Sequence, residues 1–127
     1  MAVQAFDHYN LRAARPMLEE LRAFYCEVVG LRVGERPSFR RFGYWLYAGD
    51  RAVLHLAEAD DGEQRDRSSN TLAHAAFNCT DRPAFEQRLR SRSINYRVAE
   101  VPLTRQVQLF FHDPAGNGVE LQFDAAA

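Results

Sequence analysis

The chain has 127 residues, of which 46% are hydrophobic and 12% aromatic, enough to build one folded domain with a sizeable core. Its formal net charge of −1 gives no electrostatic basis for binding nucleic acid or an anionic membrane, and no apolar run is long enough to span a bilayer. All 16 cationic residues are Arg, so chemistry that requires a Lys side chain is excluded.

The first half of the chain predicts a strand, an amphipathic helix and three further strands. Apolar residues recur at i, i+3 and i+4 in the helical segment, Pro16 suits its first turn, and Gly30 suits its C-terminal cap. A turn at 48–51 joins the last two strands as a hairpin. The expected elements are a strand over 3–11, a helix over 16–29, and strands near 31–38, 42–48 and 51–58.

The second half of the chain predicts the same order of elements. Residues 59–71 contain no large apolar residue and are expected to form a solvated, mobile connection between the halves. Pro83 lies near the start of the second helix, and Phe85 and Leu89 supply its apolar face. The expected elements are a strand over 72–79, a helix over 82–92, and strands near 94–100, 105–111 and 118–123, with a tight turn at 113–118.

Four polar residues in otherwise apolar strands are related by an internal repeat. His74 follows His8 by 66 residues, and Glu120 follows His55 by 65. Burying a His or a carboxylate among apolar neighbours is costly unless a partner satisfies it. Four such residues at repeated positions therefore predict a shared partner, for which a divalent metal ion is the simplest candidate.

The alternation of side chains along each strand predicts where these four residues point. Apolar residues alternate with three of them and would face a helix, so the polar residue projects from the opposite face of the sheet. These apolar residues are Leu54 and Leu56 around His55, Val119 and Leu121 around Glu120, and Ala75 and Phe77 after His74. We therefore expect an α+β fold in which two βαβββ modules form a curved mixed sheet around a cleft, with the helices on the outer face. Modules 1–58 and 72–124, joined by the linker 59–71, would form a single domain over 1–127.

Three segments carry a resemblance to a known family. They are Phe-Asp-His-Tyr-Asn-Leu at 6–11, Phe-Tyr-Cys-Glu-Val-Val-Gly-Leu at 24–31, and Phe-Phe-His-Asp-Pro-Ala-Gly-Asn-Gly-Val-Glu-Leu at 110–121. With the βαβββ repeat, they resemble the vicinal oxygen chelate superfamily, which includes glyoxalase I, extradiol dioxygenases, fosfomycin-resistance enzymes and bleomycin-binding proteins. The resemblance covers nearly the whole chain and is specific for the superfamily rather than for one activity.

The resemblance implies that the first and last strands of each module supply metal ligands, which matches His8, His55, His74 and Glu120. Three protein ligands with open positions suit a catalytic Ni, Zn, Mn or Fe ion that chelates two adjacent substrate oxygens. Glyoxalase I supplies a Glu where this chain has His55. The role of His55 therefore stays open between ligand and nearby base, and Glu120 or His55 would move the proton.

The function that the resemblance implies is a metal-dependent, glyoxalase-like isomerase or lyase. The first alternative is an Fe(II)-dependent extradiol dioxygenase that uses His8, His74 and Glu120 as its triad, although those enzymes have a Tyr where this chain has Phe110. A non-catalytic binding protein of the bleomycin-resistance type is the second alternative, although those members lack the metal ligands. The fosfomycin-resistance enzymes depend on a Lys, which this chain lacks.

Substrate contacts are expected near the metal ligands. Asn10 shares the strand parity of His8, while Trp45 and Phe110 are repeat counterparts that would line the cleft. Arg105 either holds an anionic substrate group or is simply solvated. We further expect a small-molecule substrate, no nucleic-acid or membrane partner, and the homodimer common in the superfamily. Two widely separated cysteines without a signal peptide predict reduced thiols in a cytoplasmic protein.

Overall fold

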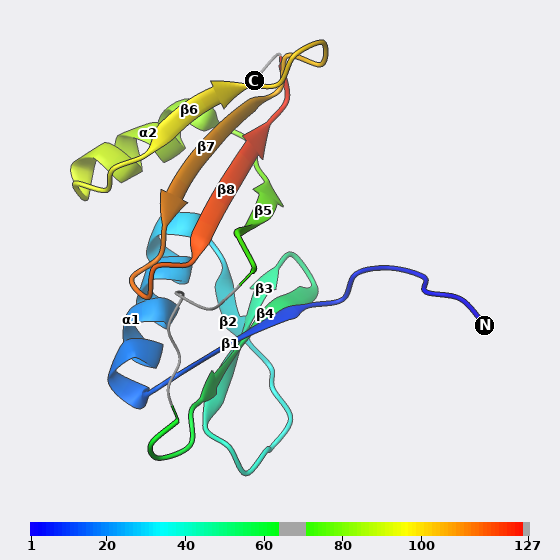
Figure 1. The fold of residues 1–127 in the computed structure, drawn as a ribbon, viewed down its shortest axis with the longest axis vertical. Coiled ribbons are helices and arrows are strands. Elements are labelled where there is room, and N and C mark those ends of the chain that lie inside the picture. The colour runs from blue at the N-terminus through cyan, green and yellow to red at the C-terminus, as the bar shows by residue number, and fades with distance from the viewer. Residues whose placement is uncertain (64–70, 126–127) are drawn as a thin grey trace. The chain divides into compact units, whose positions relative to one another are not determined.

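The computed structural model describes residues 1–63 and 71–125, and its contacts divide the chain into two compact units, Met1–Arg65 and Asp66–Ala127. Within the described residues each unit has the order strand, helix, three strands, and forms its own four-stranded mixed sheet (Figure 1). The prediction of an α+β fold built from two βαβββ modules is confirmed. Residues 64–70, most of the expected linker 59–71, lie outside the described residues.

Unit 1 has the sheet order β1-β4-β3-β2, with β1 parallel to β4 and the other pairs antiparallel. Its elements are β1 (Tyr9–Ala13), α1 (Arg15–Phe24), the π-helical turn η1 (Tyr25–Val29), β2 (Arg32–Gly34), β3 (Gly43–Ala48) and β4 (Arg51–Glu58). The first strand begins later than the predicted residue 3, because residues 1–8 are exposed and bury no apolar side chain. Strand β2 is shorter than predicted, because Arg36 donates to the Arg41 carbonyl at 2.8 Å and closes the following residues into a loop.

The predicted helix over 16–29 forms as α1 followed directly by η1. Pro16 lies in the first turn, where its missing N–H costs nothing. The chain leaves the helix at Gly30, whose φ of 97° is open to glycine, and both Gly30 N and Leu31 N donate to the Tyr25 carbonyl at 3.0 and 2.8 Å. The helix end is therefore satisfied by backbone groups, and the predicted C-terminal cap is confirmed.

The core of unit 1 lies between α1 and one face of its sheet. Leu18 and Leu21 of α1 are buried, as are four leucines of the strands, namely Leu11, Leu46, Leu54 and Leu56. Full burial of such a side chain contributes about 1.5–3 kcal/mol. Tyr44 lies opposite Leu56 in the strand register, and its hydroxyl donates to Glu19 Oε1 on α1 at 2.5 Å. Because side chains alternate, Trp45 and His55 project from the other face.

Unit 2 repeats this architecture with the sheet order β5-β8-β7-β6, so that β8 lies between β5 and β7 (Figure 1). Its elements are β5 (His74–Asn78), α2 (Arg82–Ser91), β6 (Arg97–Glu100), β7 (Val107–His112) and β8 (Gly118–Phe123). Strands β6 and β7 begin two to three residues later than predicted. Ser93 and Arg105 have φ values of 55° and 65°, which turn the chain just before each strand.

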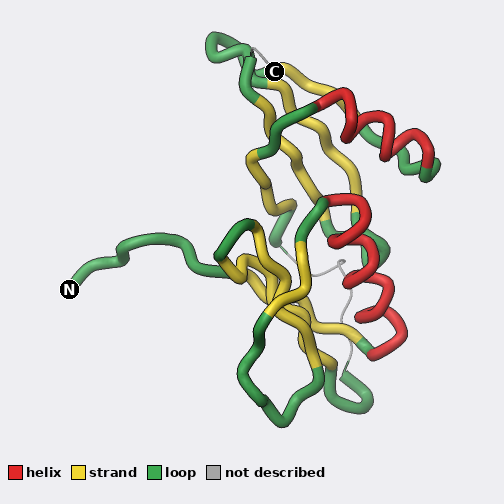
Figure 2. Tube along the Cα trace, turned by 180° about the vertical axis from the view of Figure 1, so that it is seen from behind, coloured by secondary structure: helices red, strands yellow, loops and turns green. Residues whose placement is uncertain are grey.

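Helix α2 lies along its own sheet, as α1 does in unit 1 (Figure 2). Asp81 caps its start by accepting a hydrogen bond from Ala84 N at 3.3 Å, Leu89 is buried, and Phe85 packs edge-to-face on Phe123 of β8 with ring centroids 5.7 Å apart. Among the residues described, no helix has the length and apolar character that crossing a membrane requires.

The tight turn predicted at 113–118 is built around one buried carboxylate. Asp113 is 4% exposed, and its Oδ1 accepts hydrogen bonds from Ala115 N and Asn117 N, both at 2.9 Å. Its Oδ2 accepts from the Asn117 side chain at 2.9 Å. These bonds fix the β7–β8 connection, which places Gly118 and Glu120 on the strand that follows.

Candidate metal and substrate site

One row of residues crosses the face of the unit 1 sheet that lies opposite α1. In the strand register Asn10 of β1 faces His55 of β4, and His55 faces Trp45 of β3. Residues opposite each other in neighbouring strands project from the same face of a sheet. Asn10 and Trp45, the predicted substrate residues of unit 1, therefore lie on either side of His55 in the sheet.

Three rings stack in this part of unit 1. The rings of His8 and His55 have centroids 3.7 Å apart at an interplanar angle of 15°, and Trp45 stacks on the other side of His55 at 4.1 Å and 10°. Burial is the main cause that lowers the pKa of His55, with the neighbouring His8 contributing in the same direction. The neutral imidazole, the form that binds metals or accepts a proton, is therefore favoured at position 55.

His8 is oriented by a carboxylate that the sequence analysis did not single out. Its Nδ1 lies 2.7 Å from Oδ2 of Asp7, and this hydrogen bond holds the pKa of the Asp7 carboxyl below its usual value. A carboxylate at this distance favours the tautomer with the proton on Nδ1, which leaves the lone pair on Nε2. The His8 side chain is 38% exposed and lies just before β1. Its outer nitrogen therefore remains open to a ligand.

Unit 2 brings its two predicted ligands into direct contact. His74 begins β5, Glu120 lies in β8, and His74 Nε2 is 3.0 Å from Glu120 Oε1. Glu120 is only 5% exposed, and its Oε2 accepts a hydrogen bond from Gln108 Nε2 of β7 at 3.1 Å. Phe110 faces Glu120 across the strand register and packs edge-to-face on His74 at 5.8 Å between ring centroids. Both carboxylate oxygens of Glu120 therefore have a polar partner, and the Phe110 ring lies beside them.

The donor atoms in unit 2 fit a divalent metal ion. Metal bonds of about 2.0–2.2 Å to His nitrogen and carboxylate oxygen place two neighbouring donors about 3.0–3.4 Å apart. The 3.0 Å between His74 Nε2 and Glu120 Oε1 lies within that spacing and is also the length of a direct ion pair between the two groups. Imidazole and carboxylate together suit Zn, Ni, Mn or Fe. Among the described residues, however, no three His, Cys, Asp or Glu side chains form a group able to hold a metal. Each unit thus presents a pair of donors.

The pair in unit 1 differs from the pair in unit 2. An imidazole nitrogen binds a metal along its lone pair, which lies in the plane of the ring. Because the His8 and His55 rings are stacked and nearly parallel, their lone pairs do not converge on one point. In this conformation one of the two can bind a given ion, and joint binding requires one ring to turn.

Comparison with known proteins gives the family. The family model described as Glyoxalase/Bleomycin resistance protein/Dioxygenase superfamily matches residues 5–121. The chain belongs to this superfamily. The match extends over both βαβββ units and includes all four predicted ligands, and it confirms the vicinal oxygen chelate resemblance drawn from the three sequence segments.

Relatives of this superfamily member include a curated protein and several solved structures. Glyoxylase I 4 of Arabidopsis thaliana is 30% identical over 110 residues, which cover 82% of this chain and 63% of the Arabidopsis protein. A glyoxalase family protein from Bacillus anthracis has a TM-score of 0.75 at 24% identity, covering 98% of each chain. Lactoylglutathione lyase from Agrobacterium tumefaciens has a TM-score of 0.70 at 20% identity, covering 99% of this chain and 98% of that one. These two structures share the superfamily fold.

The remaining predicted residue, Arg105, lies in a turn before β7. Its side chain is 70% exposed, and its Nε contacts the carboxylate of Glu100. The sequence analysis of this superfamily member did not identify Gln108 or Asp7 as partners of the donors. For Gln108 a signal exists in the strand parity, because it lies two residues before Phe110 and therefore on the same face as Glu120.

Proposed function

We propose that the protein is a metal-dependent, glyoxalase-like enzyme that acts as an isomerase or lyase on a small substrate with two adjacent oxygens. The observation that carries this proposal is the contact between His74 Nε2 and buried Glu120 in unit 2, together with the repeat-related His8 and His55 in unit 1. The superfamily and the similarity to a relative named as a glyoxylase support the class of reaction. The chain spans 63% of the length of that relative.

The proposed roles follow from the contacts of each residue. His8, His74 and Glu120 would hold a Ni, Zn, Mn or Fe ion, and His55 would complete the set or lie beside it. Such an ion, when bound, polarises two adjacent substrate oxygens. Glu120 or a ring nitrogen of His55 would receive and return the substrate proton. Trp45 and Phe110, each packed on a donor ring, would exclude water from the reacting atoms.

Extradiol ring cleavage with Fe(II) is the second candidate. The stacking of His55 on His8 favours it, because it leaves His8, His74 and Glu120 as a triad with His55 as a neighbouring base. Phe110 has no group that can donate or accept a proton, which favours the isomerase or lyase reaction. Oxygen uptake with a catechol under Fe(II) would identify ring cleavage, whereas turnover of lactoylglutathione without oxygen would identify the first candidate.

We also propose that two chains form a homodimer. In such a dimer the metal ligands would come either from one chain or, by exchange of units, from both chains. Homodimers are common in the superfamily to which the chain belongs, which supports the proposed dimer. Light scattering during size-exclusion chromatography would show a mass of two chains. A monomer that binds metal with full affinity would contradict the dimer.

The chain offers a direct test of metal binding, because Trp45 is its only tryptophan and stacks on His55 at 4.1 Å. Adding Ni, Zn, Mn or Fe(II) to chelator-treated protein is expected to change Trp45 emission with a saturable dependence. His74→Ala and Glu120→Ala are expected to weaken binding at least tenfold. His112→Ala removes the fourth histidine, which is exposed and outside the proposed ligand set, and serves as the matched control. Protein that binds none of these metals would exclude both enzyme candidates and leave a small-molecule binding protein.

A further inference from the structure

A hollow of about 440 Å³ opens in unit 2, and the proposed metal ligand His74 forms part of its lining. Its polar side chains include Asn95, Arg97 and His112, and Phe110 forms part of its wall. None of the described residues that line it is Asp or Glu. The volume lies in the range of small-molecule sites, and a permanent cation without a neighbouring carboxylate suits a negatively charged ligand.

Arg97 of β6 is the charged residue of this hollow. Its guanidinium carbon lies 4.4 Å from the centroid of Phe110, the ring that packs on His74. A guanidinium stacked on a ring uses its face, whereas its N–H donors lie in its plane and point away from the ring. Within the described part of the chain no hydrogen bond or ion pair engages those donors. They are therefore free to receive a planar anion.

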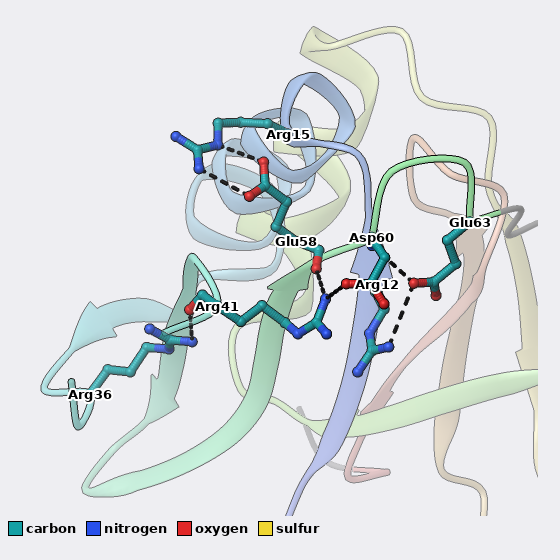
Figure 3. A network of polar contacts seen from close by, with 7 residues as sticks. All are labelled: Arg12, Arg15, Arg36, Arg41, Glu58, Asp60 and Glu63. Carbon is teal, nitrogen blue, oxygen red and sulfur yellow. Dashed lines mark hydrogen bonds and ion pairs between the residues drawn. The ribbon is translucent and has the colours of Figure 1, made fainter. Parts of the chain in front are cut away.

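Several other arginines of the described residues are already paired with carboxylates. In unit 1, Arg12 contacts Glu63, Arg15 forms a two-pronged pair with Glu58, and Arg41 contacts Asp60 at 3.0 Å (Figure 3). In unit 2, Arg82 pairs with Glu86. Arg105, the residue that the sequence suggested for an anionic substrate, contacts Glu100. Arg97 also lies over an aromatic ring, as Arg15 does, but among the described residues no carboxylate pairs with its guanidinium.

We propose that the hollow binds a carboxylate or phosphate oxyanion, with the Arg97 guanidinium as its anchor and the Phe110 ring holding that guanidinium in place. The in-plane N–H groups match the oxygens of such an anion in a two-pronged geometry. Assigning the oxyanion to the substrate rests on the function proposed above, because the hollow adjoins His74. The substrate class is then a small acidic compound, whose anionic group lies in the hollow while its adjacent oxygens face the donors.

The binding test uses the full chain without metal, so that its result does not depend on turnover. Lactate, inorganic phosphate and the neutral propane-1,2-diol are titrated while the Arg97 Nε–H signal is followed by NMR. Lactate or phosphate is expected to shift this signal to saturation, and the diol is expected to leave it unchanged. The better of the two anions identifies whether a carboxylate or a phosphate is preferred.

Four variants separate the contribution of the Arg97 anchor from that of general charge, with anion binding followed by calorimetry. Arg97→Gln is expected to weaken anion binding at least tenfold, as a lost charged hydrogen bond does, and Arg97→Lys to fall between it and the native protein. Arg32→Gln is the matched control, because Arg32 also lies over a ring, that of Tyr47 at 5.2 Å, but already donates to the Gly49 carbonyl at 2.5 Å. An Arg97→Gln variant that binds the anion as tightly as the native protein would overturn the proposal. A loss of anion affinity in Arg32→Gln equal to that in Arg97→Gln, or a larger loss in Arg105→Gln, would also overturn it.

The Trp45 metal titration on the same variants keeps this proposal separate from the proposed function. Metal binding that is intact in Arg97→Gln, with anion binding lost, is the expected combination. Native protein that binds metal but neither anion would contradict the oxyanion site alone. Native protein that binds an anion through Arg97 but binds no metal would contradict the proposed enzyme and leave the oxyanion site standing as a binding pocket.

Discussion

Replacing Gln108 by Ala is expected to weaken metal binding about 10- to 100-fold. Gln108 Nε2 donates to Glu120 Oε2 at 3.1 Å, and Glu120 is 5% exposed, so water has little access to replace the lost donor. A hydrogen bond to a charged group contributes about 1.5–3 kcal/mol, and each 1.4 kcal/mol corresponds to about tenfold in affinity. The result agrees with the 10- to 100-fold that partners of metal ligands usually contribute.

The measurement is calorimetric titration of chelator-treated protein with Zn and Ni, with thermal unfolding recorded in parallel. Gln122→Ala is the control, because Gln122 faces Gln108 in the strand register but, within the described residues, makes no side-chain hydrogen bond to Glu120. We expect Gln122→Ala to bind metal like the native protein. An affinity of Gln108→Ala within twofold of the native value, or an equal loss in both variants, would refute the argument that Gln108 supports the ligand Glu120.

Three other predictions concern the remainder of the fold. Desolvation raises the pKa of Cys79 to about 11 from 9.0, so its thiolate fraction at pH 8 should be about 100-fold below that of an ordinary thiol. Iodoacetamide labelling followed by mass spectrometry should therefore show slow alkylation of Cys79 in the folded protein. An alkylation rate equal to that in urea would contradict the raised pKa. The hydrogen bond from Tyr44 lowers the pKa of Glu19, so this contact stabilises the fold above pH 4.5 and loses its effect as the pH falls through the folded pKa. Tyr44→Phe should therefore lower the free energy of unfolding in urea by about 0.5–1 kcal/mol at pH 7, a small value because Glu19 is 41% exposed. The loss should be smaller at pH 3, and a loss that does not change with pH would contradict this explanation. Gly118→Ala places a Cβ 2.2 Å from the Ala73 carbonyl oxygen and 2.9 Å from His74 Cβ, and should destabilise the fold by about 1–3 kcal/mol, whereas an unchanged melting temperature would show that β5 moves aside freely.

The repeated fold could be predicted because its signals are periodic and local. Pro16 and Gly30 mark the ends of the first helical segment, and the apolar alternation around His55 and Glu120 identifies the face that packs on each helix. The strand ends were less accurate. The turns before β6 and β7 depend on positive φ at Ser93 and Arg105, residues that do not favour such angles.

The sequence selected candidate site residues but not the contacts that they make. Repeat spacing selected His74 and Glu120, and the structure places them 3.0 Å apart. Nothing in the spacing distinguishes this pair from His8 and His55, whose rings stack instead. The difference arises from side-chain rotation, which sequence periodicity does not encode.

Arg97 illustrates the same limit for charge. Arginine is abundant in this chain, and the sequence suggested Arg105 for an anionic group but gave no reason to select Arg97. The structure shows Glu100 beside Arg105 and the Phe110 ring beneath Arg97. Which arginine is already neutralised depends on neighbours across strands and turns, so it could be read only from the fold.

The central proposal is that His74 and Glu120 of unit 2 hold a divalent metal ion. A crystal structure of metal-loaded protein, with anomalous diffraction recorded at the absorption edge of the metal, tests it most directly. We expect a single peak within about 2.0–2.2 Å of His74 Nε2 and a Glu120 carboxylate oxygen, with His8 of the same or a second chain as the third ligand. A peak that contacts neither His74 nor Glu120, or no peak in protein soaked with Zn, Ni, Mn or Fe(II), would contradict the account.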